Sequence, residues 1–149
     1  AEWWADPDRP RFRCEDKLLI LADAGGSNNC RYWLWKQQVQ EQVADQFGIE
    51  VMICHYPTGT SKWNPLEYSL FSQISRNWAG KPLCSWDIML NYIRGTMTDT
   101  GLQVKAFLVD RIFEKQKKVT AEERAALRLY PRSICPTWNY VIKPRLCCG

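Results

Sequence analysis

Two carboxylates stand where they could hold a metal ion. Asp23 ends an apolar run and is followed by a turn that contains Gly25 and Gly26. Because α/β sheets present their ligands at the carboxyl ends of strands, Asp23 is a candidate functional residue. Glu67 lies two residues after a proline, in what should be the first turn of a helix. Each acid also has a simpler interpretation, since Asp23 can cap the turn and Glu67 can interact favourably with the helix dipole.

The chemistry that would unite these acids is metal-assisted phosphoryl transfer. Carboxylates are the ligands that Mg²⁺ and Mn²⁺ prefer, and two such ions about 3.5–4 Å apart suit in-line displacement at phosphorus. The second predicted strand and its loop deliver the helix of Glu67 next to the place where the first strand ends. We therefore expect Asp23 and Glu67 to converge at one edge of the sheet.

The loop before Glu67 brings further polar and aromatic groups to the same edge. His55, the single histidine of the chain, could orient a phosphate or a metal-bound water, or could be an ordinary loop residue. Lys62 and Trp63, followed by Asn64, combine a cation with a ring that can stack on a displaced base. The alternative is a lysine in water and a tryptophan in the core. A later basic stretch could follow a DNA backbone or form a solvated surface: Arg111, Lys115, Lys117 and Lys118.

The composition narrows the functional classes. The chain has 149 residues, 46% of them hydrophobic and 24% charged, which is typical of one folded domain rather than a disordered segment. The net charge of +4 is compatible with nucleic acid as a partner. Seven cysteines without a CxxC pair signal neither a zinc ribbon nor a disulfide framework, and reduced thiols are expected. The glycine-rich turn lacks the lysine of a phosphate loop, and the single histidine lacks a nucleophile signature. No apolar run is long enough to span a membrane and no signal peptide begins the chain, so a cytoplasmic location is expected.

The elements that position these residues alternate between strand and helix. The apolar run 17–22 predicts a strand that is buried on both faces and central in its sheet. Residues 31–47 predict a helix, because four apolar residues recur at intervals of four: Trp35, Val39, Val43 and Phe47. Residues 49–54 predict a second strand. Strand, helix and strand in this order indicate a right-handed parallel crossover, and hence an α/β fold.

Two further helices are predicted downstream. Asn64 and Pro65 mark the start of one that runs to about Trp78, and Ser85 caps another that runs to about Arg94. The remaining predictions are a strand over 104–109, a short helix opened by the capping box of residues 120–123, an extended segment over 138–142 and an unstructured tail over 146–149.

Long strings of this sequence resemble one protein family. They are LLILADAGGSN over residues 18–28, HYPTGTSKWNPLE over 55–67 and LFSQIS over 70–75. With further similarity from Trp3 to Ile142, the chain resembles the Rhodopirellula-type DDE transposases of bacterial insertion sequences. This resemblance implies an RNase H-like fold, in which a mixed sheet flanked by helices holds an Asp, Asp, Glu triad.

The resemblance also assigns roles to individual residues. Asp23 matches the second acid and Glu67 the third, and both would bind two Mg²⁺ or Mn²⁺ ions that support DNA strand cleavage and strand transfer. The implied partners are DNA, both transposon ends and target, and further copies of the chain assembled on it. No small-molecule substrate or membrane is implied, and the protein would act at the nucleoid of the bacterial cytoplasm.

The sequence departs from the family in lacking the first acid. That Asp and a helix-turn-helix region lie upstream in the family, and residues 1–16 supply neither. We therefore expect a partial catalytic domain, with core motifs over 17–78, a C-terminal extension over 79–142 and a tail over 143–149. Such a chain should be inactive alone and should expose an unpaired sheet edge that favours association. The alternatives are an inactive remnant or domesticated DNA-binding module, and a metal nuclease related by fold.

Overall fold

The computed structural model of the chain describes residues 15–110 and 118–145. The chain divides into two units, which are described separately below. The sheet unit comprises residues 1–58 and 116–149, and the helical unit comprises residues 59–115.

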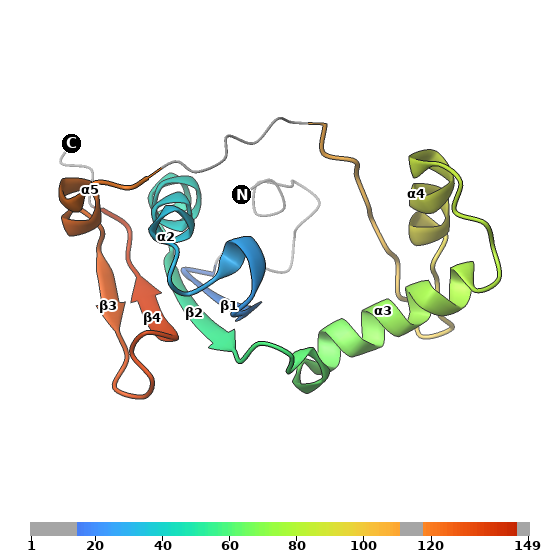
Figure 1. Cartoon of the computed structure of the whole chain (residues 1–149), viewed down its shortest axis with the longest axis horizontal. Coiled ribbons are helices and arrows are strands. Elements are labelled where there is room, and N and C mark those ends of the chain that lie inside the picture. The colour runs from blue at the N-terminus through green and yellow to red at the C-terminus, as the bar shows by residue number, and fades with distance from the viewer. Residues whose placement is uncertain (1–14, 111–117, 146–149) are drawn as a thin grey trace. The chain divides into compact units, whose positions relative to one another are not determined.

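A four-stranded mixed sheet organises the sheet unit, in the order β1-β2-β4-β3 (Figure 1). Its two longer strands, β1 (Lys17–Asp23) and β2 (Glu50–Tyr56), are parallel. The short strands β3 (Leu129–Pro131) and β4 (Asn139–Ile142) are antiparallel to each other, and β4 is antiparallel to β2. The parallel pair joined by a helix confirms the predicted crossover, and the combination of mixed sheet and helices confirms the α/β class.

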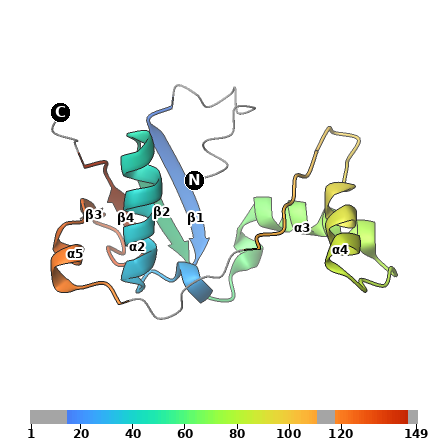
Figure 2. The same cartoon turned by 90° about the horizontal axis from the view of Figure 1, so that it is seen from above.

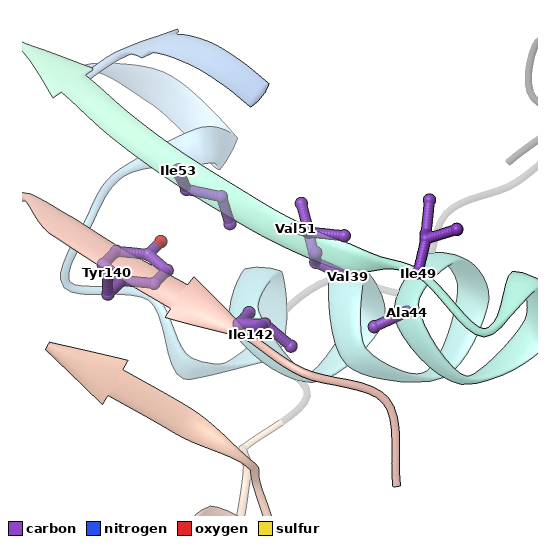
Figure 3. Packing of buried hydrophobic residues seen from close by; sticks show 7 residues of the cluster. All are labelled: Val39, Ala44, Ile49, Val51, Ile53, Tyr140 and Ile142. Carbon is purple, nitrogen blue, oxygen red and sulfur yellow. The ribbon is translucent and has the colours of Figure 1, made fainter. Parts of the chain in front are cut away.

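Helix α2 (Trp33–Val39) and its continuation η3 (Gln40–Asp45) pack on one face of this sheet (Figures 1 and 2). The core lies between them and consists of buried residues from helix and strands (Figure 3): Val39, Ala44, Ile49, Val51, Ile53, Tyr140 and Ile142. The register aligns Ile53 of β2 with Ile20 of β1 and Tyr140 of β4, so alternate residues of three strands point toward the helix. Predicted helix positions Trp35, Val43 and Phe47 pack against this cluster, as the sequence indicated.

The helix itself is not a single α-helix. Residues 40–45 form a π-helical segment, and the Ile49 amide donates to the Ala44 carbonyl at 3.1 Å before the chain enters β2. Gly48, with a φ of +65°, makes the turn between helix and strand. Apolar residues spaced by four fit an α-helix and a π-turn alike, so the sequence pattern could not distinguish them.

Strand β1 differs from its prediction in burial and position. It lies at one end of the strand order, so no described strand pairs with its outer edge. Its residues alternate between exposed and half-buried or buried, and Leu19 and Leu21 are 56% and 41% exposed. Within residues 15–110 and 118–145, β1 is therefore an edge strand with one exposed face, and not the central strand buried on both faces that was predicted. A uniformly apolar run carries no alternation that could have revealed the open face.

In the helical unit, α3 (Pro65–Trp78) and α4 (Trp86–Arg94) confirm both predicted helices. The Ser85 hydroxyl accepts a hydrogen bond from the Ile88 amide at 3.2 Å, as a helix cap should. The Asn77 side chain joins the helices by donating to the Tyr92 carbonyl and to Thr96 Oγ1. On α3, Ile74 is buried, whereas Phe71 is 55% exposed.

The later segments match their predictions unevenly. The capping box of Thr120 and Glu123 opens α5 (Ala121–Ala125), and β4 fits the extended segment over 138–142; both predictions are confirmed. The strand over 104–109 is wrong, because those residues form no strand; the isolated bridge between Met97 and Gln103 ends just before them. Strand β3 was not predicted, since three residues ending in a proline give no strand pattern. The tail over 146–149 and most of the basic stretch lie outside the described residues.

No helix within residues 15–110 and 118–145 is long and apolar enough to cross a membrane. The described cysteines, Cys30, Cys54, Cys84 and Cys135, are free thiols.

Candidate active site

Asp23 is the last residue of β1, beside Tyr56 at the carboxyl end of β2. The main-chain ladder continues one step further, since the Ala24 amide donates to the Tyr56 carbonyl at 3.0 Å. The strand end is thus fixed by backbone hydrogen bonds up to the turn, while the Asp23 side chain is exposed. This is the position that the sequence predicted for a ligand-binding carboxylate.

The turn after Asp23 leaves its carboxylate little room on one side. Gly25 lies so close that a Cβ placed there would be 3.1 Å from Asp23 Oδ2 and 3.7 Å from the Thr58 methyl. Thr58 follows β2, so the position that a Gly25 side chain would take lies between the Asp23 turn and the segment that leaves β2. The sequence marks Gly25 as a turn residue but does not indicate how close it lies to the Asp23 carboxylate.

His55 lies on β2, not in the loop that the sequence predicted. It stands opposite Ala22 in the register and is 6% exposed, on the face that carries Val51 and Ile53. Its Nε2 shares a hydrogen bond of 3.0 Å with the hydroxyl of Tyr140 on β4. By alternation along the strands, His55 points to the helix side, whereas Asp23 belongs to the opposite face. The structure thus brings the main chains of these two candidates together and separates their side chains.

Burial keeps this polar pair neutral. Desolvation lowers the pKa of His55, and the Lys36 cation lowers it further, although the main chain and carboxylate of Asp23 oppose the shift. Desolvation also raises the pKa of Tyr140, despite an opposing contribution from Trp35. The Asp23 main chain approaches the imidazole, but His55 Nδ1 makes no hydrogen bond of good geometry within the described chain. A neutral imidazole therefore accepts or donates at Nε2 while its other nitrogen lies buried and unpaired.

A buried lysine completes this inner cluster. Lys36, the middle residue of α2, is 8% exposed, and its Nζ lies 4.6 Å from the Trp33 ring centroid and 4.9 Å from that of Tyr140. Burial lowers the pKa of Lys36. Contacts of a cation with two aromatic faces offset part of its desolvation cost. No local sequence pattern indicates this cluster, because Tyr140 contacts Lys36 only through the pairing of β4 with β2.

The other candidates lie together in the helical unit. Lys62 and Trp63 belong to the short helix η4 (Ser61–Trp63), and Asn64 directly precedes α3. Lys62 is exposed and Trp63 is 58% exposed, so the alternative of a core tryptophan does not apply. Glu67 is the third residue of α3, as predicted, and its side chain lies outside the described part of the structure.

The Asp23 carboxylate is exposed at the end of a strand held by hydrogen bonds. Carboxylate oxygens are the type of ligand that Mg²⁺ and Mn²⁺ prefer. Within the described residues, no group of three or more His, Cys, Asp or Glu side chains is close enough to form a metal site.

Comparison with known proteins gives a match to a protein-family model. Neither the curated proteins nor the solved structures contain a match to the chain. A model of the family described as Rhodopirellula transposase DDE domain matches residues 1–144, which is nearly the whole chain. The exposed acid at the end of β1 fits a family named for its acidic residues. The chain therefore belongs to the Rhodopirellula transposase DDE domain family.

Proposed function

We propose that the chain supplies the second and third acids of a transposase that cleaves and joins DNA strands. The observation that carries this proposal is the exposed carboxylate of Asp23 at the carboxyl end of two parallel strands, in a member of a DDE family. Glu67 in the first turn of α3 is the proposed third acid. The proposed complete fold is RNase H-like, with the first acid on strands outside those described.

The acids would act as ligands for Mg²⁺ or Mn²⁺, two ions in the complete site. When bound, such ions activate a water or a 3′ hydroxyl and stabilise the leaving oxygen of the phosphodiester. The contribution of the chain is to hold the ligands in place. Asp23 suits this role because backbone hydrogen bonds to β2, including the one from the Ala24 amide to the Tyr56 carbonyl, hold the end of the strand.

DNA is the proposed partner, as transposon ends and as target. Lys62 and Trp63 are neighbouring exposed residues, one able to contact a phosphate and the other to stack on an unpaired base. Asn64 is half-buried at the start of α3, where it could hydrogen-bond to sugar or phosphate. His55, buried against Tyr140, would support the sheet edge from within. The protein would act at bacterial DNA in the cytoplasm, as an oligomer assembled on its substrate.

Mn²⁺ binding tests whether the two acids share a site. We expect Mn²⁺ to broaden the NMR signals of both Asp23 and Glu67, and either Asp23→Asn or Glu67→Gln to abolish the broadening at both positions. The matched controls are Asp16→Asn, just before the same strand, and Asp87→Asn, in the first turn of α4. If broadening at each acid survives substitution of the other, the acids do not share ions and the assignment fails.

The competing function is a DNA-binding module without catalysis. Such a module would bind duplex DNA with an affinity that falls steeply as salt rises. Its binding would be unchanged by Glu67→Gln, and Mn²⁺ would broaden neither acid. DNA binding measured by fluorescence anisotropy at several salt concentrations, beside the Mn²⁺ experiment, therefore separates the two functions.

A further inference from the structure

We infer that Gly25 is a positioning residue for the Asp23 carboxylate. Because glycine has no side chain, position 25 leaves room for that carboxylate. This inference rests on the proposed function, in which Asp23 is a metal ligand. Gly25 has no side chain that could bind metal or DNA, and it stands in the turn after β1.

The backbone conformation does not explain a glycine at position 25. Gly25 has φ of −90° and ψ of 171°, an extended conformation that any residue adopts. Its neighbour Gly26 differs, since a φ of +60° lies in the left-handed region that favours glycine. An alanine would thus be tolerated by the backbone at Gly25 and strained at Gly26.

The steric room at position 25 does explain the glycine. A Cβ on Gly25 would lie 3.1 Å from Asp23 Oδ2, which is inside the roughly 3.5 Å of a comfortable non-bonded contact. The same Cβ would be in ordinary van der Waals contact with the Thr58 methyl, at 3.7 Å, so the contact with the carboxylate is the tight one. At Gly26, by contrast, an added Cβ would meet nothing within 4 Å.

The carboxylate would have to yield, because it is the exposed partner in this contact. A shift of a few tenths of an ångström relieves a contact of this length. Metal–ligand distances in working sites hold to within about 0.2 Å, so a shift of that size disturbs a metal site more than it disturbs the fold. Gly25 therefore sets where the Asp23 oxygens can lie.

The test compares Gly25→Ala with Gly26→Ala in the full chain, using Mn²⁺ titration followed at the Asp23 NMR signal and thermal unfolding. We expect Gly25→Ala to keep or raise the melting temperature, because alanine restricts the unfolded chain. The same variant should bind Mn²⁺ about tenfold more weakly, as expected when support for a metal ligand is disturbed. Gly26→Ala should show the reverse: a lower melting temperature and unchanged Mn²⁺ affinity while the chain is folded.

The outcomes separate this inference from the proposed function. If Asp23→Asn abolishes Mn²⁺ binding but Gly25→Ala binds like the unmodified chain, the positioning role is wrong and the proposed site stands. If Asp23→Asn itself leaves Mn²⁺ binding unchanged, the proposed site is wrong. A Gly25→Ala chain that fails to fold would also overturn the inference, because glycine would then be required by the turn.

Discussion

At the scale of single residues, the main finding is a polar cluster in the core behind the candidate site. His55, Tyr140 and Lys36 are each less than 10% exposed, yet they occupy the face where aliphatic residues pack. The sequence singled out His55 because it is the one histidine beside a candidate loop. It could not show that the ring is buried, since its partner Tyr140 is 85 residues away and meets it only through the β2–β4 register.

The Tyr140 hydroxyl should contribute measurably to stability. Tyr140→Phe keeps the ring against Lys36 but removes the hydrogen bond to His55, whose Nδ1 is already unpaired. We expect the free energy of unfolding to fall by about 1–3 kcal/mol, the cost of leaving a buried polar group unsatisfied. Urea unfolding at neutral pH measures this change. Tyr130→Phe is the control, because Tyr130 is 45% exposed, and an equal effect of both substitutions would contradict the role of the buried pair.

Among helices and strands, local sequence patterns predicted the ones that are specified by their own residues. The parallel strands carry apolar runs, and α3, α4 and the capped α5 carry apolar periodicity or a cap within a few residues. The π-segment η3 and strand β3 depend instead on distant partners. Gln40, fully buried in η3, donates to the Lys143 carbonyl at 2.8 Å and accepts from the Arg128 amide at 3.0 Å. Those bonds join segments about 90–100 residues apart, which no local pattern reveals.

Asp45, at the end of η3, should make stability depend on acid pH. Burial alone would raise its pKa, but hydrogen bonds and the charge of Arg145, helped by Gln40, lower the pKa below its usual value. The unfolded chain therefore takes up the proton first, and the stabilisation present above about pH 4 is lost as pH falls through the pKa of the folded state. The ion pair of Arg145 and Asp45, in which the nitrogen and oxygen are 2.6 Å apart, would break in the same pH range.

Asp45→Asn should lower the free energy of unfolding by about 1 kcal/mol at neutral pH, because it removes a partly exposed ion pair. The difference from the unmodified chain should shrink as the pH falls below about 4, because Asp45 then becomes protonated first in the unfolded and then in the folded chain. Urea unfolding over a pH series from neutral to acid measures it, with Glu41→Gln in the same segment as the control. A difference that persists undiminished at low pH would show that the charge of Asp45 is not the cause.

At the scale of the whole molecule, the sequence predicted the family and the α/β class, and the matched family and mixed sheet confirm both. It also placed Asp23 correctly at a strand end and Glu67 in the first turn of α3. These successes rest on contiguous strings of sequence. The open face of β1 was missed because exposure is set by what covers a strand, and the strand's own leucines are alike on both faces.

That open face leads to a prediction about association. The outer edge of β1 has no partner among the strands that the structure describes, and Leu19 and Leu21 beside it are exposed. An apolar strand edge with free backbone groups pairs readily with another chain.

We expect the chain to self-associate as its concentration rises, and Leu19→Lys to shift it toward monomer, because a charged side chain on an edge strand opposes pairing. Sedimentation velocity over a concentration series measures the shift. Ile134→Lys is the control, since Ile134 is 75% exposed outside the strands and its substitution changes charge equally. If both substitutions reduce association alike, net charge and not the β1 edge governs it.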